Sequence, residues 1–166
     1  MNPQSPNAMM TDLLTILKKP VASFVYSRFS QAYPDKFSTM MEEHLNNNQN
    51  VMKAKQESSE VFEQREHFIE LMDIQGVLQL IDRGWSEVFV DYSDSMRDDV
   101  RNLLENRHAW AHQKKLTIGD VQEVAQIAKR LLNKMKTSSA KNATKKIRQL
   151  LRHDYYRHIP LAEHYI

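Results

Sequence analysis

The sequence predicts an all-α protein, a bundle of about five or six helices, for three reasons. Only three of the 166 residues are glycine and five are proline, whereas sheets joined by tight turns depend on glycine for positive φ angles. Apolar residues recur at helical spacing along most of the chain. The composition, 41% apolar and 27% charged, is typical of a folded globular domain rather than a disordered one.

Two helices are expected in the first part of the chain, before Tyr33. The first runs from Met9 to Lys19, and Pro20 opens the second, because a proline's missing N–H does no harm in a first turn. A shorter helix follows from Phe37 to Leu45. The asparagine-rich, polar run over residues 46–60 then predicts an exposed loop.

The second part of the chain carries clearer helix signals. A strongly periodic segment runs from Phe62 to Arg83, and Gly84 stops it. After a short amphipathic connector, Ser93 or Asp94 caps a helix that reaches Trp110. Thr117 and Asp120 form a Thr-x-x-Asp capping box that opens the next helix. Beyond a break at residues 137–139, a basic helix follows with Ile147, Leu150 and Leu151 as its apolar anchors.

Composition also narrows the functional classes. The chain has no cysteine, which excludes disulfides, thiolate zinc sites and cysteine nucleophiles. Its first residues lack the basic and apolar regions of a secretory signal, and no stretch approaches the roughly 20 apolar residues of a membrane-spanning helix. We therefore expect a cytoplasmic protein without a membrane partner.

The net charge of +2 hides an asymmetry along the chain. From Lys129 onward ten lysines and arginines stand against Asp154 and Glu163, a balance of 10 − 2 = +8. The first 128 residues therefore carry 13 − 19 = −6. A basic carboxyl-terminal segment on an acidic body favours contact with phosphates, and the alternative is an ordinary solvated helix face.

Arg107 and His112 are the pair of residues with the chemistry of a nuclease. An arginine is a permanent cation whose planar fork suits phosphate oxygens, and a histidine moves a proton near neutral pH. Together they suffice for metal-independent RNA cleavage, in which the histidine deprotonates a ribose 2′-hydroxyl and the arginine neutralises charge on the phosphate. Spacing alone does not select this pair, because Arg148 and His153, among others, fit the same pattern.

Context distinguishes the pair, because the sequence resembles the HEPN superfamily (higher eukaryotes and prokaryotes nucleotide-binding). The resemblance is to the branch with an Arg-Asn-x-Trp-Ala-His-like core, and it covers roughly Asp12 to Met135. It rests on Phe-x-Gln-Ala-Tyr at 29–33, on an "Asp…Leu-Leu…Trp…Val-Phe" block within 72–89, and on an intact Trp-Ala-His-Gln at 110–113. We accordingly assign residues 1–136 to a HEPN-like helical domain and residues 137–166 to a basic carboxyl-terminal helical extension.

The resemblance implies an enzyme site that is completed when two copies of the chain face each other across a two-fold axis. Its catalytic residues are then Arg107, His112 and His108, supported by Asn106, Glu105 and Trp110. On one regular helix, positions five residues apart point about 140° away from each other. Two symmetry-related helices, or a break in the helix, are therefore needed to bring Arg107 and His112 to one phosphate. The alternative is structural: a helix-end pair that caps carbonyls and packs on Trp110.

Two positions depart from the family pattern. The usual asparagine after the arginine stands before it, as Asn106, and His108 takes the place after it. His108 is then a second proton carrier or an orienting hydrogen-bond partner. Lys114 stands where the toxins that a nucleotidyltransferase silences have a tyrosine, so that mode of regulation is not expected.

The basic extension supplies further candidates for RNA binding, namely Lys141, Lys145, Lys146, Arg148 and Arg152. Cations suit the RNA backbone, and the nearby Tyr155 and Tyr156 suit unpaired bases. The alternative is a helix docked through Leu150, Leu151 and the tyrosines, with its lysines solvated. We expect no metal site, because the histidines at 153, 158 and 164 lack carboxylate or cysteine partners in a defined arrangement.

These observations together predict a small HEPN-type endoribonuclease that acts as a homodimer, without metal or cofactor. By resemblance, its setting is a microbial toxin–antitoxin or antiviral (phage) defence system, with an antitoxin or a defence-complex protein as a further partner. One alternative is a catalytically silent HEPN module that binds RNA or scaffolds a defence complex. Another is a regulatory helical protein that docks on a protein partner through its basic tail.

Overall fold

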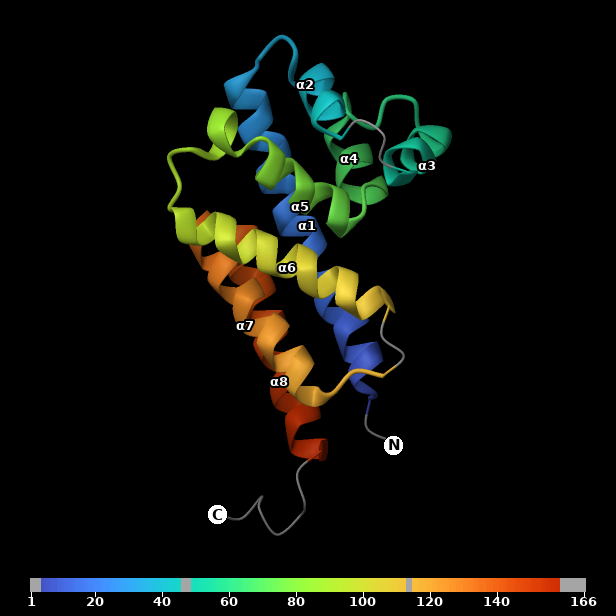
Figure 1. The fold of residues 1–166 in the computed structure, drawn as a ribbon, viewed down its shortest axis with the longest axis vertical. Helices are drawn as coiled ribbons and strands as arrows, with labels where there is room; N and C mark the ends of the chain where they lie inside the picture. Colours follow the sequence, from blue (N-terminus) through green and yellow to red (C-terminus); the bar gives the residue numbers. More distant parts are fainter. Residues whose placement is uncertain (1–3, 46–48, 113–114, 159–166) are drawn as a thin grey trace.

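The computed structural model describes residues 4–45, 49–112 and 115–158, with side chains omitted at 50, 108, 109, 111, 112 and 153–158 (Figure 1). Every regular element in these ranges is helical, so the predicted all-α class is confirmed. The elements are α1 (Pro6–Ala32), α2 (Phe37–His44), α3 (Gln49–Glu57), α4 (Arg65–Leu71), α5 (Ile74–Arg83), the π-helical turn η1 (Trp85–Phe89), α6 (Asp94–His112), α7 (Ile118–Met135) and α8 (Ser138–His158).

Helix α1 is the central element of the bundle. Figure 1 shows it along the long axis of the molecule, with α2, α3 and α4 gathered at one end and α7 and α8 alongside its other half. Helix α6 lies between α5 and α7 and packs against both. The core is one continuous cluster of buried side chains to which α1, α5, α6, α7 and α8 all contribute.

The two helices expected on either side of Pro20 are one helix of 27 residues, with Pro20 inside it. A proline in a helix interior removes one backbone hydrogen bond and costs roughly 3 kcal/mol. Here Pro20 is itself buried, and fully buried Leu17 and Val21 flank it on the same apolar face. Packing of that face against the rest of the bundle outweighs the local cost, so the predicted break is wrong.

The middle of the chain divides into more and shorter helices than the sequence pattern predicts. Residues 49–57 of the expected loop at 46–60 form α3, because Val51 and Ala54 are buried and Lys55 forms an ion pair with Glu42 of α2. The expected single helix from Phe62 to Arg83 is interrupted between α4 and α5. Asp73 is the N-cap of α5, because its carboxylate accepts a hydrogen bond from the backbone N–H of Gly76 at 2.8 Å.

Gly84 ends α5, as predicted, but for a reason that lies outside the helix. Its φ of −90° is open to any residue. A Cβ at this position would lie 2.9 Å from the backbone oxygen of Leu80 and 2.9 Å from the ring of Phe29 in α1. Close approach of α5 to α1 therefore requires the glycine. Trp85, which follows, is buried in the core.

The end of α1 is tied to η1 by a hydrogen bond between side chains. The hydroxyl of Tyr33 donates to Oε2 of Glu87 at 2.6 Å. This bond raises the pKa of Tyr33 to about 12, with partial burial as a second cause. The same bond lowers the pKa of Glu87 below its ordinary value.

Helices α7 and α8 follow the sequence prediction closely. Both hydrogen bonds of the capping box at Thr117 and Asp120 are present, at 2.8 and 3.1 Å. The apolar stripe of α7 is buried, and α8 packs against α1 and α7 through Ala140, Ala143 and Ile147. Leu150 and Leu151 are only partly buried on the same core.

Candidate nucleic-acid interface

Helix α6 carries the sequence motif, and ion pairs hold it to both neighbouring helices. On the α5 side, Asp82 accepts from Arg97 at 3.0 Å and from Arg101 at 2.8 Å. On the α7 side, the buried carboxylate of Asp99 accepts from Arg130 at 3.2 Å and from Lys134 at 2.9 Å. The amino-terminal part of α6 is therefore set in position, and the motif lies in its last two turns.

Arg107 lies half-buried on the face of Trp110. The guanidinium carbon is 4.7 Å from the centroid of the indole ring, a cation–π contact worth about 0.5–2 kcal/mol, depending on exposure. Among the described residues Arg107 forms no ion pair with a carboxylate. Its charge is thus available to an anion, while the aromatic face restricts its orientation.

Arg107 and Trp110 line a hollow of about 280 Å³, which we call the Arg107 hollow. Thr11, Thr15 and Lys18 of α1 line its other side, and the junction of α4 and α5, which includes Asp73, completes the lining. The ammonium group of Lys18 donates to the backbone oxygen of Glu70 at 2.8 Å, which holds a second cation at this site.

Sequence reasoning missed these α1 residues, which lie about 90 positions before the motif. The one signal for them is their spacing: positions 11, 15 and 18 follow i, i+4, i+7 and so form a polar stripe along one side of the helix. Nothing in that pattern connects the stripe with Arg107, because only the folded chain brings residues of α1 and α6 to the same hollow.

The predicted catalytic histidines fall on positions whose side chains lie outside the described residues. His108 and His112 are part of α6, which continues without interruption through the motif to His112. A break in the helix is therefore not the means by which Arg107 and His112 reach one phosphate. About 140° of rotation round the helix axis separates the two positions.

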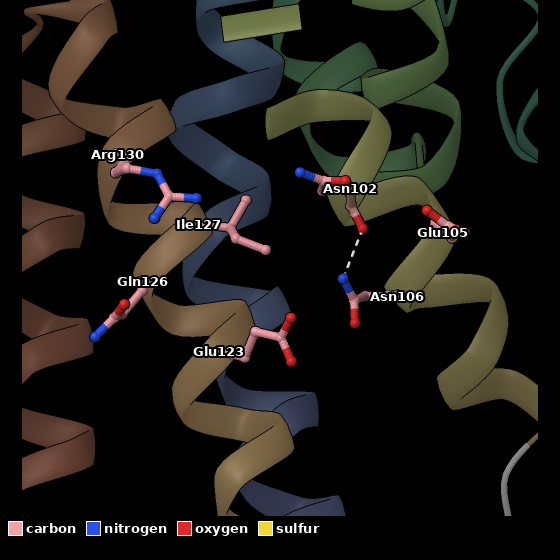
Figure 2. A pocket seen from close by; sticks show the side chains of 7 residues that line it. All are labelled: Asn102, Glu105, Asn106, Glu123, Gln126, Ile127 and Arg130. Carbon is pink, nitrogen blue, oxygen red and sulfur yellow. Dashed lines mark hydrogen bonds between the residues drawn. The ribbon is translucent and has the colours of Figure 1, made fainter. Parts of the chain in front are cut away.

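Two predicted supporting residues lie apart from Arg107. Glu105 and Asn106 line a hollow of about 560 Å³ between α6 and α7, which we call the α6–α7 hollow, whereas Arg107 lines the hollow beside α1. Figure 2 shows Glu123, Ile127 and Arg130 of α7 facing α6 across the α6–α7 hollow. The side-chain nitrogen of Asn106 donates to the backbone oxygen of Asn102 at 2.8 Å, as Figure 2 also shows. Trp110 alone of the supporting residues contacts the arginine.

The five predicted RNA-binding cations also divide between two faces. Lys141, Lys145 and Arg148 line a hollow of about 480 Å³ between α7 and α8. Lys146 faces α1 instead, in a hollow that includes Asp12, and Arg152 is exposed. Lys129 and Arg130 of α7 and Lys136 just after it lie on the same side as the first three. They belong to the basic segment that the sequence indicates, but sequence reasoning did not name them as RNA-binding residues.

The described ranges contain neither a candidate metal site nor a candidate membrane-spanning helix. No cluster of three or more histidine or acidic side chains there has the arrangement of a metal site. None of the helices in that part of the chain is both long enough and apolar enough to cross a membrane.

Comparison with known proteins identifies the family. The family model described as Swt1-like HEPN matches residues 12–136 of the chain. No curated protein and no solved structure matches it. The matched region runs from the first turns of α1 to the end of α7 and includes the whole of α6 with its motif. The chain therefore belongs to the Swt1-like HEPN family.

Proposed function

We propose that the chain is a metal-independent endoribonuclease that acts as a homodimer, with Arg107 and His112 as its catalytic pair. One observation carries the proposal. Arg107 is half-buried on Trp110 with no ion-pair partner among the described residues, and it borders a hollow that a second cation, Lys18, and the carboxylate-bearing Asp73 also line. A partly buried guanidinium that no carboxylate pairs is suited to a phosphate.

The reaction is transesterification at one RNA linkage. The 2′-oxygen attacks phosphorus, its proton passes to the imidazole of His112, and the bond from phosphorus to the 5′-oxygen breaks. A second imidazole, from His108, protonates the leaving 5′-oxygen. Arg107 stabilises the negative charge on the phosphate oxygens. The products are a 2′,3′-cyclic phosphate and a free 5′-hydroxyl, so no water, metal or cofactor enters the step.

Helix geometry supports the proposed homodimer. Because α6 is unbroken, its positions 107 and 112 lie about 140° apart round the helix axis, so they face different sides of one copy. A two-fold axis near the end of α6 places Arg107 of one copy opposite His112 of the other, in the manner of an isologous interface.

The test is incubation of the purified protein with total RNA in EDTA, followed by analysis of the new RNA ends. We expect cleavage that leaves cyclic phosphates, and its loss in Arg107→Ala and in His112→Ala. Arg107→Lys retains the charge but not the fork and should lose most of the activity while keeping RNA affinity. Asp98→Ala, an exposed position on the same helix, is the matched control.

Mixing the two inactive variants tests the composite site. If Arg107 and His112 act across the two-fold axis, half of the randomly formed dimers are mixed and each holds one complete pair. The mixture should then recover roughly a quarter of the wild-type activity. RNA that stays intact with the wild-type protein contradicts the nuclease, and a mixture as inactive as its components contradicts the shared site.

One observation favours a second candidate, a catalytically silent module for RNA binding or scaffolding. The contact with Trp110 gives Arg107 a packing role that needs no chemistry. The same assay separates the candidates, because a silent module retains RNA in a gel shift and leaves it uncut. For either candidate we propose a cytoplasmic toxin–antitoxin or phage-defence setting, in which an antitoxin or defence-complex protein is a further partner.

A further inference from the structure

Three hollows on the face formed by α6, α7 and α8 join end to end. The α6–α7 hollow shares Gln126 and Arg130 with the next hollow, of about 460 Å³. That one shares Asn133, Thr144 and Arg148 with the hollow between α7 and α8. We call the whole the α6–α8 groove. From Glu123 to Lys136, the residue that caps α7, it spans 13 residue steps, or about 20 Å at 1.5 Å per residue.

Charge divides the α6–α8 groove into two parts. Six cations line the part over α7 and α8: Lys129, Arg130, Lys136, Lys141, Lys145 and Arg148. Arg130 is bound to Asp99, and the other five have no ion pair within the described part of the chain. On α8 the cations at 141, 145 and 148 follow helical spacing, and those at 129, 130 and 136 lie on α7 and at its carboxyl-terminal cap, so cations from both helices face one trough. Such a trough suits the phosphates of an extended strand.

The other part, the α6–α7 hollow, is unsuited to phosphate. Glu105 and Glu123 line it, and neither has a hydrogen-bond or ion-pair partner within the described ranges. Their carboxylates repel an anion and accept only from N–H or O–H donors. Amides of Asn102 and Asn106 supply both donors and acceptors beside them. Ile127, which is 6% exposed, gives the hollow an apolar floor.

We propose that the α6–α8 groove binds single-stranded RNA, with the phosphates on the α7–α8 cations and one unpaired guanine base in the α6–α7 hollow. The proposal rests on the proposed function for the choice of RNA as ligand. Guanine carries two adjacent donors, N1–H and N2–H, that match the two oxygens of Glu123. Its O6 accepts from the amide of Asn106 or the guanidinium of Arg130, and its ring lies on Ile127. Uracil lacks the exocyclic amino group and fits worst.

This assignment gives Glu105 and Asn106 a role distinct from chemistry. They lie next to Arg107 in the sequence, but they line the opposite flank of α6. A helix is about 10–12 Å across with its side chains, so a bound base lies close to the catalytic arginine without touching it. The hollow then selects which linkage of a strand reaches Arg107, and the sequence motif carries specificity as well as catalysis.

The test is fluorescence anisotropy with two labelled 2′-O-methyl strands of about ten nucleotides, one all-uridine and one with a single central guanosine. These strands have no 2′-hydroxyl and stay intact whatever the activity of the protein. We expect the guanosine to raise affinity roughly tenfold. Glu123→Gln should remove that preference and leave the salt dependence unchanged, whereas Glu43→Gln, an exposed carboxylate on α2, should change neither.

The cationic part is tested by salt dependence. Each phosphate contact contributes about 0.7 to the slope of log affinity against log salt for single strands. The double variant Lys145→Gln/Arg148→Gln should therefore lower the slope by about 1.4 and keep the guanosine preference. The matched control is Lys53→Gln, an exposed lysine on α3.

Each outcome decides one statement. Equal affinity for the two strands, or equal effects of Glu123→Gln and Glu43→Gln, overturns the base site. An unchanged salt slope in the double variant overturns phosphate binding by the cations of α7 and α8. The same conclusion follows if polyglutamate binds the protein as tightly as RNA does. If the protein cleaves total RNA but binds the two strands equally, the proposed nuclease activity holds and the proposed base site in this groove is wrong. Guanosine-dependent binding without cleavage supports the groove and removes the nuclease.

Discussion

Replacing Asp99 with asparagine tests whether the ion pairs between α6 and α7 stabilise the fold. The Asp99 side chain is 7% exposed and accepts from Arg130 and Lys134, whose side chains are 52% and 28% exposed. Charge-assisted hydrogen bonds contribute about 1.5–3 kcal/mol each, and breaking a fully buried pair costs about 3–5 kcal/mol. Because both cations regain water when the charge is removed, we expect a net loss of about 2 kcal/mol.

The measurement is urea unfolding followed by tryptophan fluorescence, together with thermal unfolding. For a chain of this size, 1 kcal/mol corresponds to a change of about 2–4 °C in Tm. Asp99→Asn should therefore lower Tm by about 4–8 °C. The matched control is Asp98→Asn, the exposed neighbour on the same helix, which should stay within about 0.5 kcal/mol of the wild type.

Two results would refute this reasoning. If Asp99→Asn is as stable as Asp98→Asn, the ion pairs seen between α6 and α7 contribute nothing net. If Lys134→Met in the Asp99→Asn background costs as much as it does alone, the lysine acts independently of the carboxylate. Additional salt supplies a check on the mechanism, since screening should reduce the difference between wild type and variant.

Three further predictions concern stability. Gly84→Ala should destabilise the fold by about 1–3 kcal/mol in urea unfolding, because the added Cβ lies 2.9 Å from two atoms. Gly119→Ala, whose Cβ meets only ordinary contacts, should stabilise it by about 0.5–1 kcal/mol. A Gly119→Ala variant less stable than the Gly84→Ala variant would contradict the packing argument. Lys136 ends α7 at φ 55°, so Lys136→Gly should raise Tm whereas Lys136→Val lowers it. The hydrogen bond from Tyr33 to Glu87 raises the tyrosine pKa from 10.0 to about 12. Its contribution to stability is therefore complete below pH 10 and is lost as the pH rises to 12, and Glu87→Gln should return the pKa toward 10.0 in an ultraviolet titration of tyrosinate.

The sequence located the candidate site only in part. Arg107 was found by its chemistry and its motif, and its contact with Trp110 lies within one helical turn, where spacing is informative. The motif also led to Glu105 and Asn106 as partners of Arg107, but side chains adjacent in a helix point to different flanks. Lys18 was missed for the opposite reason, because its proximity to Arg107 comes from two helices far apart in the sequence.

The sequence alone determined the helical class, the family and the helix starts that depend on short-range hydrogen bonds. The capping box at Thr117 is such a case, since both of its bonds join residues three positions apart. Tertiary structure decided where helices continue or break. Pro20 lies inside α1 and Val51 inside α3 because burial against distant helices outweighs the local preference. Short-range contacts are encoded in the pattern itself, whereas the free energy of burial depends on partners that only the folded chain supplies.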